Sequence, residues 1–140
     1  MAAGADPNAL DGQRYDAVTI AAVANDLPTI RTALQLGNKA TNITSPYNGT
    51  ALIAAAHLGH SDVVKILIAA GAPLNHINNL GWTALIEAVI LGDGGASHIA
   101  TVKALVDAGA DRNIADRQGT TPLGHAKARG YAELIRLLSP

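Results

Sequence analysis

The fold is decided by residues 50–72, which read TALIAAAHLGHSDVVKILIAAGA. Thr50 is a candidate N-cap, and the apolar residues that follow it, beginning with Leu52, fall on one helical face. Gly59 suits the left-handed end of that helix because it has no Cβ atom. A second apolar stripe follows the turn, and Gly71 ends it. The stretch therefore predicts two short helices joined by a tight turn.

The same unit recurs along the chain. The sequence TALI occurs at residues 50–53 and again 33 residues later at 83–86, and TPL follows after a further 38 residues at 121–123. The five extra residues fall between the two helices of that unit, around residues 93–97. Upstream, Ala17 and Val18 match the start of the first helix. A period near 33 residues is typical of a repeat protein in which each unit packs on its neighbours.

These residues resemble the ankyrin repeat, whose pattern is roughly D-x-x-G-x-T-P-L-H-x-A-A-x-x-G-H-x-x-V-V-x-x-L-L-x-x-G-A-x-x-N. The resemblance covers essentially all of the chain, and LGWTAL at residues 80–85 is more similar to bacterial members than to eukaryotic ones. In one respect the sequence departs from the pattern, because the position of the histidine after T-P-L is taken by Ile53, Ile86 and Gly124. The departure puts in doubt the usual polar tie between repeats, but not the fold. The first full unit carries the pattern at Thr50, Leu52, Ala55, Ala56, Gly59, His60, Val63, Val64, Leu67, Gly71, Ala72 and Asn75.

The resemblance implies an all-α solenoid of about four helix-turn-helix units with short β-hairpin-like fingers. We expect a single domain over residues 1–140. Residues 4–8 carry a repeat-closing signature without preceding helices, so the start looks truncated in the middle of a repeat, as in an engineered fragment. The expected units span about 5–37, 38–71, 72–109 and 110–140.

Composition narrows the function. The net charge is −1 and the basic residues form no stripe, which argues against a nucleic-acid partner. The longest apolar runs are far below the ~20 residues that span a bilayer, so we expect no membrane insertion. We expect a monomer. The chain has no cysteine, which excludes disulfides but does not fix the compartment, cytoplasmic or periplasmic for a bacterial protein.

No catalytic or metal-binding pattern stands out. The five histidines lack partners at ligand spacing, so we interpret them as solvent-facing or capping residues and expect no cofactor, no metal and no enzyme activity. Residues 93–95 read as a flexible turn or a loop that contacts a partner. Glu87 is the acid within an apolar first helix. The resemblance places it on the concave face, exposed rather than buried, with partner contact or a hydrogen bond from the next finger as its role.

Three of the four aromatic residues, Tyr15, Tyr47 and Trp82, each precede a first helix. Such residues suit a protein-binding surface, although Trp82 could instead stiffen the finger base. The chain is therefore predicted to be a non-catalytic protein-interaction module. The alternatives are a structural spacer or capping module, or a small-molecule or metal site near His57 and Glu87. The concave face implied by the resemblance comprises Tyr15, Pro46, Tyr47, His57, Leu58, Asn79, Leu80, Trp82, Glu87, Ile90, Leu91, Arg117 and Gln118.

Overall fold

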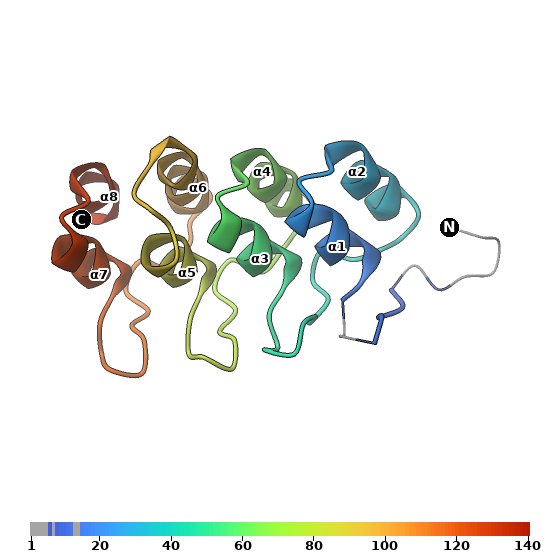
Figure 1. Cartoon of the computed structure of the whole chain (residues 1–140), viewed down its shortest axis with the longest axis horizontal. Coiled ribbons are helices and arrows are strands. Elements are labelled where there is room, and N and C mark those ends of the chain that lie inside the picture. Colours follow the sequence, from blue (N-terminus) through green and yellow to red (C-terminus); the bar gives the residue numbers. More distant parts are fainter. Residues whose placement is uncertain (1–5, 7, 13–14) are drawn as a thin grey trace.

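The computed structural model describes residue 6, residues 8–12 and residues 15–140. Within these ranges, eight helices follow one another in four pairs, and the extended connections between pairs project to one side as fingers (Figure 1). The predicted all-α solenoid is confirmed. The helices are α1 (Ala17–Val23), α2 (Leu27–Gln35), α3 (Ala51–Leu58), α4 (Ser61–Ala69), α5 (Ala84–Ile90), α6 (Ala96–Asp107), α7 (Pro122–Arg129) and α8 (Ala132–Leu138).

The helices form two layers. The first helix of each pair packs on the first helix of the next, so α1, α3, α5 and α7 make an inner row beside the fingers. Helices α2, α4, α6 and α8 make the outer row. Between the rows lies a thin core of alanine and aliphatic side chains, in which Leu52, Leu67, Leu85, Leu105 and Leu134 are fully buried. A core this thin needs no phenylalanine, and the chain has none.

Every inner helix begins with the same cap. The side-chain oxygens of Asp16, Thr50, Thr83 and Thr121 each accept a hydrogen bond from the backbone N–H three residues later. This bond satisfies an amide group that the first helical turn leaves free. Gly59 ends α3 with a φ of 71°, as its lack of a Cβ predicts. The predicted N-cap at Thr50 and the predicted stop at Gly59 are confirmed.

Each finger is closed by a side chain five residues before the cap. These four residues are of three types, namely Asp11, Ser45, Asn78 and Asp116. A side-chain oxygen of each accepts a hydrogen bond from the backbone N–H four residues later. In the last three fingers the same oxygen also accepts from the N–H two residues later. The fingers are therefore held in a fixed shape from within.

The closing asparagine of one unit binds the backbone of the next. Asn8 Oδ1 accepts the N–H of Lys39 at 2.9 Å, and Asn75 Oδ1 accepts the N–H of Asp111 at 2.8 Å. Asn8 thus does what the closing asparagine of a complete unit does. The other residues of the signature at 4–8, except Asp6, lie outside the described ranges.

The five-residue insert lengthens a helix. We expected the five extra residues, around 93–97, to lie between the two helices, but α6 begins at Ala96 and has 12 residues where α4 has 9. The expectation was wrong at this end because part of the insert, Ala96 and Ser97, forms the first turn of α6. The rest of it, from Asp93 to Gly95, stays in the loop between α5 and α6.

A ring at the start of each later outer helix ties its unit to the preceding one. His60 Nε2 donates to the carbonyl of Val23 at 3.2 Å, and His98 Nε2 donates to the carbonyl of His57 at 2.9 Å. The hydroxyl of Tyr131 takes the same place in the last unit, 3.4 Å from the carbonyl of Gly92. His98 is only 9 % exposed. Of the two roles considered for it, the solvent-facing one is wrong, whereas its bond to the carbonyl of His57 caps the last turn of α3 in the preceding unit.

Candidate functional site

A pocket of about 240 Å³ opens between the first two fingers and the inner helices α1, α3 and α5. Five of the residues predicted from the sequence line it together, namely Tyr15, Tyr47, His57, Leu58 and Glu87. The other residues that line the pocket carry no charge, and several of them, such as Val23 and Ile53, are apolar. Residues from three successive units therefore converge on one hollow of the inner face.

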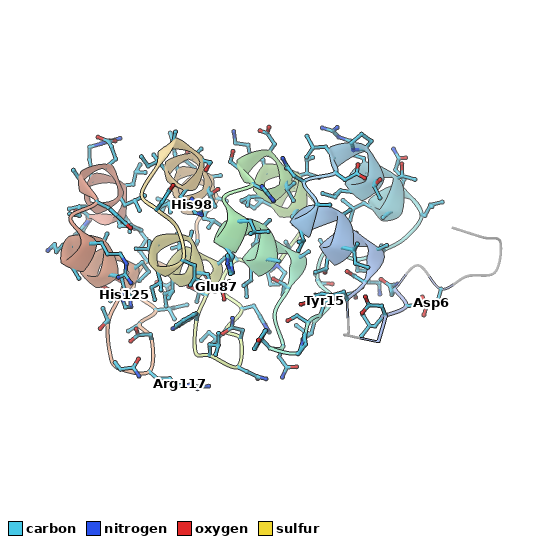
Figure 2. All side chains as sticks on the ribbon, in the orientation of Figure 1. Asp6, Tyr15, Glu87, His98, Arg117 and His125 are labelled. Carbon is cyan, nitrogen blue, oxygen red and sulfur yellow. The ribbon has the colours of Figure 1, made fainter. Side chains whose placement is uncertain are left out.

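The burial of Glu87 differs from what the sequence predicted. It is 6 % exposed, whereas we expected an exposed side chain. Its Oε1 accepts a hydrogen bond from Asn78 Nδ2 at 3.1 Å, so the donor comes from the finger of its own unit and not from the next. The expectation failed because α3 and α7 pack on the two sides of α5. Figure 2 shows the position of Glu87 on the inner row.

Burial sets the charge of this carboxyl group. Desolvation raises the pKa of Glu87 from 4.5 to about 7, although the hydrogen bond from Asn78 acts in the opposite direction. Beside it, burial and the nearby charge of His98 lower the pKa of His57. His57 Nδ1 lies 3.8 Å from Glu87 Oε2, which is too long for a hydrogen bond. Both shifts favour the neutral forms, so the two groups do not neutralise each other strongly.

Two of the predicted residues tie the fingers to one another. The backbone N–H of Asn79 donates to the carbonyl of Tyr47 at 2.8 Å, and its side-chain Oδ1 accepts from Asn48 Nδ2 at 3.0 Å. The Arg117 guanidinium, at the tip of the last finger in Figure 2, donates to the carbonyl of Asn79. Asn79 and Arg117 therefore have structural contacts, and both remain exposed at the surface.

The remaining predicted residues lie outside the pocket lining. Pro46, Leu80, Leu91 and Gln118 are exposed, and Trp82 and Ile90 are half-buried. The predicted set thus divides into a pocket group and a second group that is spread over three fingers and the end of α5. The half-buried indole fits both roles considered for Trp82, partner contact and stiffening of the finger base.

One residue of the site was missed in the sequence. Asn78 lines the pocket, closes its finger and binds Glu87. A signal was present, because Asn78 and Glu87 are nine residues apart, as are Asp116 and His125. The second pair is also in contact, with His125 Nε2 2.6 Å from Asp116 Oδ2. Both bonds lie within one unit, so they tie a finger to its own inner helix and not one repeat to the next.

Two kinds of feature are absent from the part of the chain that the structure describes. In that part, no group of three or more histidine, aspartate or glutamate side chains is arranged to hold a metal ion. Likewise, none of the helices formed by the described residues has the length and apolarity needed to cross a bilayer.

Comparisons with known proteins place the chain in a family. The family described as ankyrin repeats (3 copies) matches residues 1–78, 18–111 and 71–140. The putative ankyrin repeat protein YahD of Escherichia coli K12 is 36 % identical over 97 % of this chain and 68 % of its own length. The crystal structure of an ankyrin repeat domain from Acinetobacter baumannii AYE is 48 % identical, with a TM-score of 0.92 over 97 % of this chain and 69 % of that one.

A more distant relative is named as an enzyme. The glycerophosphocholine phosphodiesterase gde1 of Schizosaccharomyces pombe is 32 % identical over 64 % of this chain, but the match covers only 8 % of that protein. The ankyrin fold itself is generally a non-enzymatic module that mediates protein–protein interactions. The chain belongs to the ankyrin repeat family.

Proposed function

We propose that this chain binds a partner protein, without catalysis, through the face made by its fingers and inner helices. The observation that carries the proposal is the pocket in which Tyr15, Tyr47, His57 and Leu58 meet. Tyr47 is 56 % exposed although it lies at the pocket wall. Exposed aromatic residues beside a hollow are typical of the residues that dominate binding energy at protein interfaces.

Further apolar side chains extend this face toward the last two units. Leu58, Leu80 and Leu91 are exposed, while Arg117 and Gln118 add polar groups at the last finger. A partly apolar centre with a polar edge is the usual anatomy of a protein interface. A partner that buries roughly 800 Å² on each side would cover three fingers and their inner helices.

The hydrogen bonds within the fingers also support binding. Side chains close each finger, and the contacts of Asn79 with Tyr47 and Asn48 join the second finger to the third. Little conformational entropy is then lost when a partner docks, because the surface is already ordered. The structural spacer remains the alternative, since stacked units can also hold other domains apart.

The test removes the two aromatic side chains of the central fingers. The immobilised chain is incubated with a bacterial lysate and compared with Tyr47→Ala/Trp82→Ala and with Leu36→Ala, which shortens an exposed apolar side chain at the end of α2. We expect proteins retained by the first and third baits to fall at least about tenfold with the double variant. Circular dichroism checks that helicity is unchanged.

The outcomes separate the possibilities. Equal retention by the double variant would show that the proposed face is wrong. Retention of no protein by any of the three baits would favour the structural spacer.

A further inference from the structure

Glu87 brings an acidic group to the pocket without a strong counter-charge. Its Oε1 accepts a hydrogen bond from Asn78, while its Oε2 lies 3.8 Å from His57 Nδ1. In the described part of the chain, none of the ion pairs joins Glu87 to a lysine or an arginine. A buried carboxylate without a cationic partner is costly, so its position beside an open pocket calls for a functional explanation.

The pocket wall is suited to a long cationic side chain. Tyr15 and Tyr47 supply aromatic rings, and Ile53 and Leu58 supply aliphatic surface. Aliphatic and aromatic surface accommodates the methylene stem of a lysine or an arginine, and a ring face attracts its charge. The volume of about 240 Å³ is below the roughly 300–1,000 Å³ of typical small-molecule sites, which favours a single side chain over a metabolite.

We propose that this pocket receives a lysine or arginine side chain of the partner protein, with the Glu87 carboxylate as its counter-charge. The inference rests on the proposed function and adds the chemistry of the partner residue. Asn78 acts as a positioning residue, because its bond to Oε1 leaves Oε2 as the oxygen free to pair with the cation. The guanidinium of an arginine would pair with Oε2 and stack on the tyrosine rings at the same time.

The charges around Glu87 make this binding pH-dependent. His57 faces it from α3, and His98 of α6 is bonded to the carbonyl of His57. On α7, which packs on the other side of α5, His125 is paired with Asp116 of the last finger, and Lys127 and Arg129 are exposed. A cation is attracted by the ionised carboxylate and repelled by a protonated His57. Because the pKa of Glu87 is about 7, affinity should be roughly tenfold weaker at pH 6 than at pH 8.

The experiment uses small probes that reach the pocket alone. Nα-acetylarginine amide is titrated into the isotope-labelled chain and followed by NMR, with Nα-acetylcitrulline amide as the uncharged probe of nearly the same shape. We expect saturable shifts at Tyr47, His57 and Leu58 with the arginine probe, at least tenfold weaker binding of citrulline, and weaker arginine binding at pH 6 than at pH 8.

Two variants sharpen the experiment. Glu87→Gln should weaken arginine binding at least tenfold and leave citrulline binding unchanged. Asp62→Asn, which removes the same charge from an exposed position on α4, should change neither. The titration of the unaltered chain at the two pH values remains decisive if Glu87→Gln is misfolded.

The inference would be overturned by equal binding of the two probes, by an absence of saturable shifts at the pocket, or by arginine binding that ignores both pH and Glu87→Gln. None of these results affects the lysate comparison with Tyr47→Ala/Trp82→Ala. Failure of the basic-residue pocket is therefore distinguishable from failure of the binding face itself.

Discussion

The last two units contain equivalent hydrogen-bonded pairs in which the acid is on opposite sides. In the 72–109 unit, Asn78 of the finger donates to Glu87 of α5 at 3.1 Å. In the 110–140 unit, Asp116 of the finger accepts from His125 of α7 at 2.6 Å. Each pair is nine residues apart and spans a threonine cap in the same way. The geometry is shared, so the difference is in the charge.

The pKa values of the two carboxyl groups are shifted in opposite directions. The backbone N–H of Thr120 is the main cause that holds the pKa of Asp116 below its usual value, assisted by His125 and Gln118. Burial instead raises the pKa of Glu87 to about 7. The terminal pair thus stabilises its finger, whereas the central pair keeps an acid poorly compensated beside the pocket. The repeat supplies the position, and the residue types decide whether the carboxyl group there is stabilised or left poorly compensated.

The largest change in stability is expected when only the aspartate of the terminal pair is introduced into the central unit. Asn78→Asp would place a second carboxylate against the buried Glu87. Two like charges in a buried site cannot both ionise without a large cost. We expect the free energy of unfolding to fall by about 4 kcal/mol at pH 8. The loss should shrink at pH 5, where a protonated Glu87 can donate to the introduced carboxylate. Urea unfolding at both pH values measures this.

A second substitution should restore the stability that Asn78→Asp removes. Adding Glu87→His to Asn78→Asp recreates the aspartate and histidine of the terminal pair, and it should recover most of the lost stability. Asp62→Asn serves as a control for a charge change at an exposed position of the same chain. If Asn78→Asp were as stable as the unaltered chain at pH 8, the two units would not differ in the way we describe.

A smaller effect of opposite sign is expected from neutralising the central acid. The pKa of Glu87 is 4.5 in its reference state and about 7 in the folded chain, so the folded state binds more protons between these values. Stability from this group therefore falls as the pH rises from about 4.5 to about 7 and is constant above that. Relative to the unaltered chain, Glu87→Gln should gain up to about 3 kcal/mol between pH 4.5 and pH 8.

Thermal or urea unfolding of both proteins across this pH range measures the gain. Glu133→Gln is the matched control, since Glu133 is exposed on α8 and its partner is Arg136. The control should show no comparable pH-dependent gain. A Glu87→Gln difference that is independent of pH would mean that Glu87 is not held in an unfavourable charged state.

The sequence predicted the parts of the fold that depend on local patterns. The caps at Asp16 and Thr50 and the stop at Gly59 are encoded by residues within one turn of the feature they set. The start of α6 was misplaced because part of the insert is helical. His60 directly follows Gly59, but the insert places His98 six residues after Gly92, which hid the equivalence of the two histidines.

The candidate site was harder to predict because it depends on contacts between units. The burial of Glu87 results from the packing of α3 and α7 against α5, and no pattern within α5 reports it. The bond from Asn78 was visible only as a nine-residue spacing shared with Asp116 and His125. The sequence placed Tyr15, Tyr47 and His57 on one face, but their convergence on a pocket with Glu87 required the structure.

The smallest effect is expected from weakening the terminal pair. His125→Gln keeps a side-chain donor near Asp116 but removes the charge that the ring can carry. Asp116 retains its bonds from the N–H groups of Gln118 and Thr120, so the melting temperature should fall by only a few degrees. Because the pKa of Asp116 is lowered on folding, its stabilising contribution is present above the reference value of 3.8 and is lost as the pH falls through the folded value.

Melting curves at pH 7 and pH 3 test this last difference between the units. The cost of His125→Gln should be present at pH 7 and should diminish as the pH falls through the folded pKa of Asp116, which lies below 3.8, because protonation of Asp116 weakens the bond in both proteins. Glu87→Gln should instead become more stable than the unaltered chain as the pH rises, so equivalent positions in neighbouring units would show effects of opposite sign. A His125→Gln penalty as large as that of Asn78→Asp would instead show that the terminal pair, and not the burial of the central acid, dominates the stability of these two units.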